Sequence, residues 1–225
     1  MQKSNLETDL GVDIDCQLNF EAHIAKQVKK ANRMSGAIRR SFRYLDLQTF
    51  RLLFKSMVRC HLESAAPVWS PSMEGLSDMI ERVQQQATSM LPVVGKLAYH
   101  ERLRALKLTT LKSRRLRGDM IETYKVLHQL YEPAVAPHLA LRASQPGRAA
   151  PRLHPLTLTT QRSVSRVRGS TFTRRVIPVW NSLSAAVKDA PSVDAFKARL
   201  DREWASEDIL YNHKSNLSKL PAALQ

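Results

Sequence analysis

The sequence predicts a mainly α-helical protein: a helical bundle with a short N-terminal strand and a small C-terminal helical extension. Three observations support this fold class. Apolar residues recur every three or four positions through most of residues 21–131. The segments between these runs are short and contain proline, glycine or a residue suited to capping a helix. Alternation of apolar and polar residues is confined to a few short stretches. Helices that follow one another through short loops pack as a bundle.

The N-terminal strand is predicted from Leu10 to Asp15, where apolar and acidic residues alternate, with a turn near residues 17–19. The alternation places Asp13 and Asp15 together on one solvent-facing side, as a polar strand face and not as a metal-binding pair. A lone strand is not stable, so we expect residues 1–20 to be the remnant of a larger fold.

The segment from Glu21 to Arg43 is predicted to form a helix with two different sides. The residues spaced to fall on one side are Ile24, Val28, Ala31, Ser35, Ile38 and Phe42. Five cations fall on the opposite side: Lys26, Lys29, Lys30, Arg33 and Arg40. One side is therefore suited to a core and the other to anions. A membrane or calmodulin target helix has the same pattern, but this apolar side is modest and has no Trp.

Further helices follow in order. Asp46 is the expected N-cap of the second, whose buried positions would be Leu47, Phe50, Phe54, Met57, Val58, His61 and Ala65. Prolines 67 and 71 end it, and a third helix runs from Leu76 to Leu91. A short helix is expected from Tyr99 to Leu106, and a long one, capped by Thr109 or Thr110, continues to Tyr131.

The start of the long helix is basic. Its inward side carries Leu116, Met120, Tyr124 and Leu127, which leaves Arg114, Arg115 and Arg117 to point at solvent or at an anion. The alternative is that these arginines only solubilise a helical surface, which is the commoner role of a charge run.

Beyond Tyr131, five prolines between residues 133 and 155 indicate an irregular linker. Residues 156–159 could form a short strand, and helices are expected from Phe172 to Leu183 and from Val193 to Leu200, the latter started by Ser192 or Pro191.

The charge of the chain favours a polyanionic partner. Thirty-five Lys and Arg against 20 Asp and Glu give a formal net charge of +15, which suits nucleic acid first and an anionic membrane surface second. The excess is concentrated: residues 21–60 carry ten basic and two acidic side chains, residues 101–150 ten and four, and residues 151–180 six and none. Three basic patches on a mixed background suit a surface that follows a phosphate backbone.

Cysteine usage and hydropathy exclude several classes of protein. Cys16 and Cys60 are far apart, so neither a disulfide framework nor a zinc site is predicted, and the adjacent Cys60 and His61 are expected to be core residues of a helix. The N-terminus has no apolar leader, and no run approaches the ~20 apolar residues that span a bilayer. We expect an intracellular protein, in the nucleus or cytoplasm, without a cofactor.

Several segments, taken together, resemble the C-terminal part of reverse transcriptases from jockey-like non-LTR retrotransposons (LINE-type mobile elements). In chain order they are Leu10-Gly11-Val12, Leu18-Asn19-Phe20, His23-Ile24, Ala31-Asn32-Arg33 to Arg39-Arg40, Val58-Arg59, His61-Leu62-Glu63, Val68-Trp69-Ser70-Pro71, Glu81-Arg82-Val83-Gln84, Tyr99, Arg102-Leu103, Arg114 to Leu127, Trp180-Asn181-Ser182-Leu183 and Phe196-Lys197-Ala198-Arg199-Leu200-Asp201. Each piece is weak, but their order and spacing are specific. The chain departs from the family at Cys60 and Ser184, where Pro is usual, and at Ser64, where Tyr is usual.

The resemblance implies a domain organisation. Residues 1–20 would be the remnant of the palm-end strand region, 21–131 a helical thumb-like domain, 132–170 a linker, 171–204 a C-terminal helical extension and 205–225 a frayed tail. In polymerases of this kind, the thumb grips the template-primer duplex by its backbone. The chain would then be a truncated RNA-directed DNA polymerase fragment.

The chemistry of polymerisation is missing from the sequence. The family holds two Mg²⁺ ions with an aromatic-x-Asp-Asp turn, and this sequence has no adjacent pair of Asp residues. It also has no glycine-rich phosphate loop, no Gly-x-Ser-x-Gly elbow and no His-Glu-x-x-His pair. We therefore predict no catalytic residue, no metal site and no enzymatic activity for this chain alone.

Nonspecific binding of an RNA or DNA template-primer duplex is the remaining prediction, through three basic patches. The first is the five-cation side of the helix from Glu21 to Arg43, and the second is Arg114, Arg115 and Arg117. The third patch comprises Arg162, Arg166, Arg168, Arg174 and Arg175. The aromatic residues Tyr44, Trp69 and Trp180 are predicted to be core anchors and not base-stacking platforms.

Two alternatives remain open from the sequence. A helical interaction module would dock a protein or an anionic membrane, and a pseudogene product without function would lack a stable fold. Neither the oligomeric state nor a preference between RNA and DNA follows from the residues.

Overall fold

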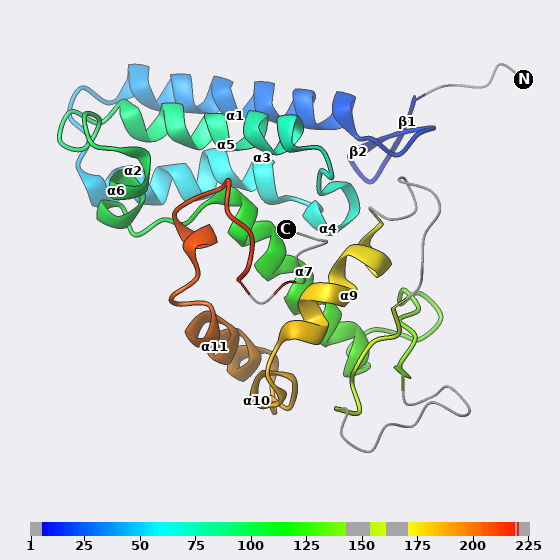
Figure 1. The fold of residues 1–225 in the computed structure, drawn as a ribbon. Helices are drawn as coiled ribbons and strands as arrows, with labels where there is room; N and C mark the ends of the chain where they lie inside the picture. The colour runs from blue at the N-terminus through cyan, green and yellow to red at the C-terminus, as the bar shows by residue number, and fades with distance from the viewer. Residues whose placement is uncertain (1–5, 143–153, 161–170, 219, 221–225) are drawn as a thin grey trace, which may run out of the picture. The chain divides into compact units, whose positions relative to one another are not determined.

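A computed structural model of the chain describes residues 6–142, 154–160, 171–218 and 220 (Figure 1). It confirms the prediction of a mainly helical fold with a short strand region at the N-terminus. The chain forms two compact units: Met1–Arg115 with Ile209–Ser215, and Leu116–Asp208 with Asn216–Gln225. The first unit thus ends at Arg115, earlier than the boundary expected at residue 131, and takes in a segment of the C-terminal tail.

The N-terminal strand has a partner that the sequence pattern did not reveal. Strand β2 (Val12–Asp15) pairs antiparallel with β1 (Leu6–Asp9), with Leu6 opposite Asp15 and Asp9 opposite Val12. Between them, Leu10 and Gly11 both have positive φ, 44° and 83°, as a two-residue hairpin turn requires. All four residues of β1 are exposed, so this strand has no apolar alternation to detect.

Helix α1 (Glu21–Ser41) confirms the prediction of a two-sided helix. Its buried residues are His23, Ile24, Ala31, Ser35 and Ile38, which pack against the π-helix η1 and helix α5, described next. The four predicted cations from Lys29 to Arg40 are all exposed. Hydrophobic periodicity was enough to place this helix, because one side is buried from His23 to Ile38. The prediction that Phe42 lies on the buried side is wrong: it follows the last residue of the helix and is 41% exposed.

The second predicted helix is divided into four pieces: α2 (Leu47–Leu53), η1 (Phe54–Arg59), α3 (Cys60–Glu63) and α4 (Ala66–Trp69). Asp46 is confirmed as the N-cap, since its side chain accepts the N–H groups of Gln48 and Thr49. Buried residues recur every four positions, at Phe50, Phe54, Val58, Leu62 and Ala66.

The π-helix explains why two predicted core positions are wrong. In an α-helix, each step of four residues turns by about 40° more than one full turn, so a row of residues at this spacing drifts around the helix. The π-helix η1 has more residues per turn and reduces this drift. The buried row therefore reaches Leu62 instead of His61. The helix ends at Glu63, and the next buried residue is Ala66, the first of α4, instead of Ala65. Ala65 is exposed with φ 53°, and Cys60 is exposed too, so Cys60 and His61 are not the predicted core pair.

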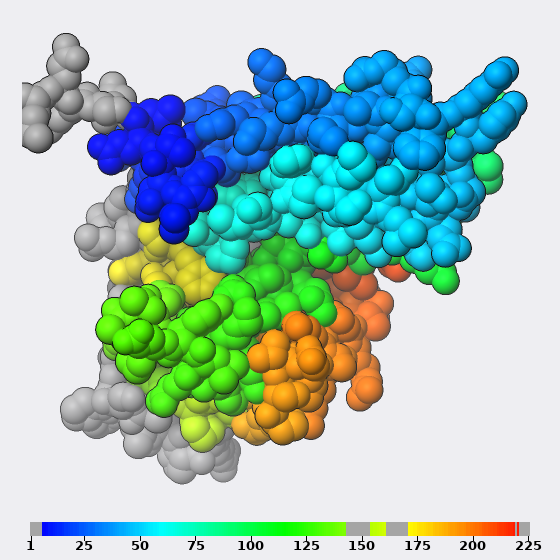
Figure 2. Space-filling model, turned by 180° about the vertical axis from the view of Figure 1, so that it is seen from behind, coloured from blue at the N-terminus to red at the C-terminus, as the bar shows by residue number. Residues whose placement is uncertain are grey.

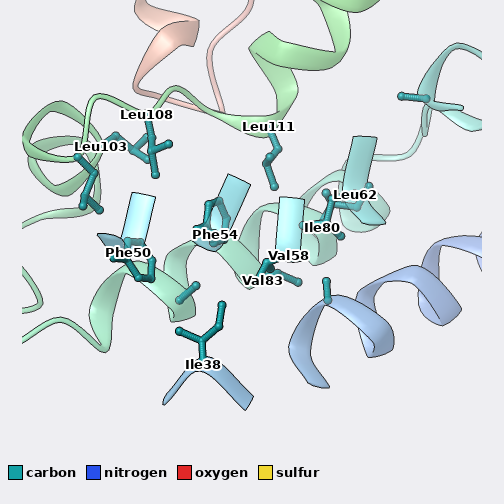
Figure 3. Close-up of a cluster of buried hydrophobic side chains, with 14 of the residues drawn as sticks. Ile38, Phe50, Phe54, Val58, Leu62, Ile80, Val83, Leu103, Leu108 and Leu111 are labelled. Atoms are coloured by element: carbon teal, nitrogen blue, oxygen red, sulfur yellow. The ribbon is translucent and has the colours of Figure 1, made fainter. Parts of the chain in front are cut away.

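Helices α5 (Glu74–Ser89), α6 (Tyr99–Ala105) and α7 (Leu111–Leu127) follow the predicted order. Thr110 caps α7, because its Oγ1 accepts the N–H of Ser113 at 3.1 Å. The helix ends at Leu127, before the predicted end at Tyr131. The core of the first unit gathers side chains from α1, α2, η1, α5 and α6, with Leu111 at the start of α7 (Figure 3).

The second unit is built on the rest of α7 with α9 (Phe172–Ser182), α10 (Ala185–Lys188) and α11 (Val193–Glu203). Its core contains a stack in which the Phe196 ring lies 4.5 Å from that of Tyr124 and 6.0 Å from that of Trp180, centroid to centroid. Of the two predicted starts, Ser192 caps α11, accepting the N–H of Ala195. The predicted strand at 156–159 is reduced to one bridge between Leu141 and Leu158, and residues 143–153 and 161–170 of the linker lie outside the described residues.

The predicted fraying of the tail from residue 205 is wrong for the part that the structure describes. A 3₁₀ turn, η3 (Asp208–Leu210), contains the fully buried Ile209. Thr110 donates its N–H to Leu210 O at 2.9 Å and its hydroxyl to Ile209 O at 2.6 Å. A few isolated apolar residues thus anchor a segment whose composition is polar, and periodicity does not reveal them.

Two glycines give opposite expectations for replacement by alanine. A Cβ at Gly118, inside α7, would meet no atom within 4 Å, whereas one at Gly95 would lie 2.4 Å from Ser89 O and 2.7 Å from Leu91 O. We expect Gly118→Ala to raise the free energy of unfolding by about 1 kcal/mol through helix propensity. Gly95→Ala should lower it by roughly 1–3 kcal/mol through overpacking against backbone. Urea denaturation of both variants tests this, and a loss of stability in Gly118→Ala would contradict the open surroundings of that position.

Candidate nucleic-acid interface

On the exposed side of α1, four of the five predicted cations have no acidic partner among the described residues. Lys29, Lys30, Arg33 and Arg40 are exposed, and no carboxylate among the described residues forms an ion pair with any of them. Glu21, in the first turn, is the only acidic residue of the helix. We call these four residues the cationic face. Figure 2 shows the blue side chains of α1 standing out from the surface of the first unit.

The helix holds the cationic face in a line. Its members are spaced by one, three and seven residues, so they stay on one side of a helix that rises 1.5 Å per residue. The distance along the axis from Lys29 to Arg40 is roughly 16 Å, enough to meet several phosphates of a nucleic-acid strand. Arg40 folds back along the helix, since its guanidinium Nη1 lies 3.3 Å from where a Cβ of Gly36 would stand.

Lys26, the fifth predicted cation of this patch, has a structural partner. Its Nζ lies 2.9 and 2.8 Å from the two carboxylate oxygens of Asp13, whose Oδ1 also accepts the Thr8 hydroxyl at 2.7 Å. These hydrogen bonds lower the pKa of Asp13, and those from Lys26 have the largest effect. Asp13 is only 4% exposed, so the prediction that it faces solvent is wrong: it joins β2 to α1.

His23 completes this junction. Its Nδ1 accepts the backbone N–H of Asp13 at 3.2 Å, and burial lowers the pKa of the imidazole. The neutral ring packs against Trp69 with the centroids 5.5 Å apart. Asp15, by contrast, accepts the N–H groups of Gln17, Asn19 and Phe20 and so closes the turn before α1.

The arginines of the second predicted patch do not form a free basic edge. In the first unit, Arg114 is paired with Glu63, and Arg115 is 5% exposed and donates to Ser77 Oγ at 2.8 Å. In the second unit, Arg117 forms a bidentate ion pair with Asp201: Nε donates to Oδ1 at 2.6 Å and Nη2 to Oδ2 at 2.8 Å. Each arginine joins helices within its own unit, so the predicted open basic edge is not formed.

The third predicted patch is described only in part. Arg162, Arg166 and Arg168 lie outside the described residues. Arg175 pairs with the buried Asp119 through two hydrogen bonds of 2.9 Å, and Arg174 is half-buried on α9. Arg175 is thus a packing residue of the second unit.

A second group of cations in the first unit was missed from the sequence. Arg51, Lys55 and Arg59 follow one another at four-residue intervals, and η1 keeps them in a row beside the buried one. Glu63 ends the row, pairing with Arg59 at 3.3 Å and with Arg114. We call Arg51, Lys55, Arg59 and Arg114 the basic cluster. Its sequence signal was the four-residue spacing of Arg51, Lys55 and Arg59, which places residues on one side of a helix.

The basic cluster has more positive charge than its one carboxylate can balance. Burial, and then the neighbouring guanidinium groups, lower the pKa of Lys55. No carboxylate of the described residues forms an ion pair with Lys55. A phosphate group placed here would relieve this repulsion, because an anion stabilises the charged form of a lysine.

Two of the three predicted core aromatics are confirmed. Trp69 and Trp180 are 1% and 0% exposed, and their indole N–H groups donate to Ser64 O and Leu156 O. Tyr44 is 86% exposed, so its assignment to the core is wrong.

Within the described part of the chain, no three His, Cys, Asp or Glu residues are arranged to hold a metal ion. The same residues include no helix with the length and apolar character to cross a bilayer. Comparison with protein-family models, with curated proteins and with solved structures finds no match to this chain.

Proposed function

We propose that this chain binds the phosphate backbone of nucleic acid without sequence specificity, and that the cationic face of α1 is its main contact. The observation that carries the proposal is four exposed cations on one helix side with no acidic partner among the described residues. Such contacts position a strand or duplex without reading its bases.

The basic cluster also supports the proposal that the chain binds an anion, because its like charges destabilise the folded chain. A row of like charges four residues apart costs the fold about 0.2–0.5 kcal/mol per pair, so its presence favours a role other than folding. An anionic ligand is the partner that makes this arrangement favourable.

The segments that resemble non-LTR reverse transcriptases support the same class of partner. In that interpretation the chain is a catalytically empty thumb and C-terminal fragment of an RNA-directed DNA polymerase, and its ligand is a template-primer duplex in the nucleus or cytoplasm. The resemblance adds a reason to expect duplex binding. The argument from the charge distribution does not depend on the resemblance.

A titration of the purified full chain with a fluorescently labelled blunt duplex tests the proposal. We expect binding that weakens linearly on a plot of log affinity against log salt concentration, because bound phosphates release counterions. Absence of binding at low salt, or binding unaffected by salt, would overturn the proposal. Stronger binding to anionic vesicles than to the duplex would favour a membrane-docking module instead.

Lys55→Gln separates binding from folding. The variant should raise the free energy of unfolding by about 0.5 kcal/mol, because Lys55 has a like-charged neighbour four residues away on each side. It should at the same time weaken duplex binding by roughly threefold, the effect of losing one phosphate contact. Urea denaturation and the duplex titration measure the two effects, and a gain in stability with unchanged affinity would remove the basic cluster from the interface.

A further inference from the structure

The turn after α1 presents an aromatic surface that the cationic face does not explain. Tyr44 is 86% exposed and Phe42 is 41% exposed, although large aromatic side chains are usually buried in cores. Arg43 lies between them in sequence, with its guanidinium carbon 5.9 Å from the centroid of the Tyr44 ring. We call Phe42, Arg43 and Tyr44 the aromatic turn.

The aromatic turn is fixed at both ends. Phe42 donates its N–H to Ile38 O at 3.2 Å, which closes α1, and the Asp46 carboxylate accepts two N–H groups at 2.9 and 3.0 Å, which opens α2. Leu45, between Tyr44 and Asp46, packs against the core. A short connection held in this way presents its rings at a small cost in conformational entropy.

The surroundings of the aromatic turn are cationic. Arg39 and Arg40 occupy the last turn of α1, and Arg43 follows. No ion pair to a carboxylate of the described residues engages these three arginines. Asp46 is the nearest acidic residue in sequence, and its carboxylate is committed to capping α2. Exposed rings among arginines at the end of a cationic helix match the chemistry of an unpaired base joined to a phosphate backbone.

We propose that the aromatic turn is a stacking platform for an unpaired base, so that the chain prefers a junction between duplex and single strand over a blunt duplex. The cationic face holds the backbone, and Tyr44 receives the first base beyond the paired region, with Phe42 beside it. This inference deepens the proposed function and rests on it. Any nucleobase offers a π-face, so no base identity is required.

The test compares two labelled ligands, a blunt duplex and the same duplex with a single-stranded overhang, against the full chain and its Tyr44→Ala and Tyr44→Phe variants. We expect the wild type to bind the overhang ligand about tenfold more tightly than the blunt duplex, in the range that stacking one base provides. Tyr44→Ala should lose this preference and keep its affinity for blunt duplex. Tyr44→Phe should keep both, because the ring remains.

Val93→Ala serves as a matched control, since it shortens an apolar side chain of the first unit that is 75% exposed and lies outside the aromatic turn. A thermal melt of each variant checks folding, which truncation of an exposed ring leaves unchanged. Equal affinity of the wild type for both ligands, or an overhang preference retained in Tyr44→Ala, would overturn the stacking platform while leaving backbone binding in place. Loss of anionic-vesicle binding in Tyr44→Ala, with no change toward the overhang ligand, would assign the turn to a membrane. Failure of the wild type to bind either ligand would instead remove the proposed function itself.

Discussion

Glu81→Ala is expected to lower the free energy of unfolding by about 3–5 kcal/mol, because two buried donors lose their acceptor. Glu81 is completely buried on α5. Its Oε1 accepts the Tyr99 hydroxyl at 2.5 Å, and its Oε2 accepts the N–H of Leu111 at 2.9 Å. That N–H belongs to the first turn of α7, where donors have no partner within the helix and a negative charge is favoured.

Removal of the carboxylate leaves these buried donors without an acceptor, which is the costly case for a hydrogen bond. Glu81→Gln is the matched variant, because it keeps the shape and one acceptor oxygen while removing the charge. We expect it to cost roughly 1–2 kcal/mol in urea denaturation. If Glu81→Ala cost less than 1 kcal/mol, the network from α5 to α6 and α7 would not hold these helices together.

The same residue predicts a pH dependence of stability. Burial raises the pKa of Glu81 above its ordinary value of 4.5, against the opposing effect of its hydrogen bond from Tyr99. The folded chain therefore holds this proton more tightly than the unfolded chain does. The resulting stabilisation is present below pH 4.5 and is lost as the pH rises through the folded-state pKa.

Glu81→Gln has no such proton, so the stability advantage of the wild type over this variant should shrink as the pH rises from about 4.5 through the folded-state pKa of Glu81. Urea denaturation of both proteins across this range measures the difference. An advantage that grows with pH would mean that Glu81 is stabilised as the charged form. Asp13, Asp15 and Asp46 have lowered pKa values and titrate in both proteins alike.

Replacing the whole cationic face is expected to have the largest effect on binding. The variant with Lys29, Lys30, Arg33 and Arg40 all changed to Gln should bind duplex on the order of 10²–10³-fold more weakly at ~0.15 M salt, as expected from losing four phosphate contacts. Glutamine is a good helix former and these positions are exposed, so α1 should remain folded.

A control variant matches both the charge and the composition of the cationic-face variant. Lys96, Lys107, Arg142 and Arg202 are also two lysines and two arginines, all exposed and none on α1. Changing them to Gln removes four positive charges, from +15 to +11, as the first variant does. We expect it to lose less than a tenth as much affinity, and equal losses would mean that only net charge matters.

The parts of the fold that the sequence predicted are those governed by local rules. The two-sided pattern of α1 gave its bounds to within two residues, and Asp46 and Ser192 were identified as caps because short polar side chains satisfy the first N–H groups of a helix. What could not be predicted depends on distant partners. The partner strand β1 is exposed throughout, and Ile209 is buried by contacts with Thr110 that no periodicity shows.

In the candidate site, too, local pattern could be predicted and distant partners could not. Lys29, Lys30, Arg33 and Arg40 could be placed on an exposed side because that side is opposite a continuous apolar one. The fate of Arg114 and Arg117 depended on Glu63 and Asp201, which lie 51 and 84 positions away in the chain. Arg51, Lys55 and Arg59 were missed although their four-residue spacing would place them on one side of an α-helix as well, because only the apolar side of this segment was used for prediction.

The slope of log affinity against log salt concentration, measured for the wild type and the two fourfold variants with the same blunt duplex, tests the central claim most directly. Each phosphate contact contributes about −0.9 to this slope. If the cationic face binds the backbone, the slope of its variant should be shallower than that of the wild type by between about 3 and 4, and the control variant should keep the slope of the wild type. Equal slopes for the wild type and the cationic-face variant would contradict the claim that α1 holds nucleic acid.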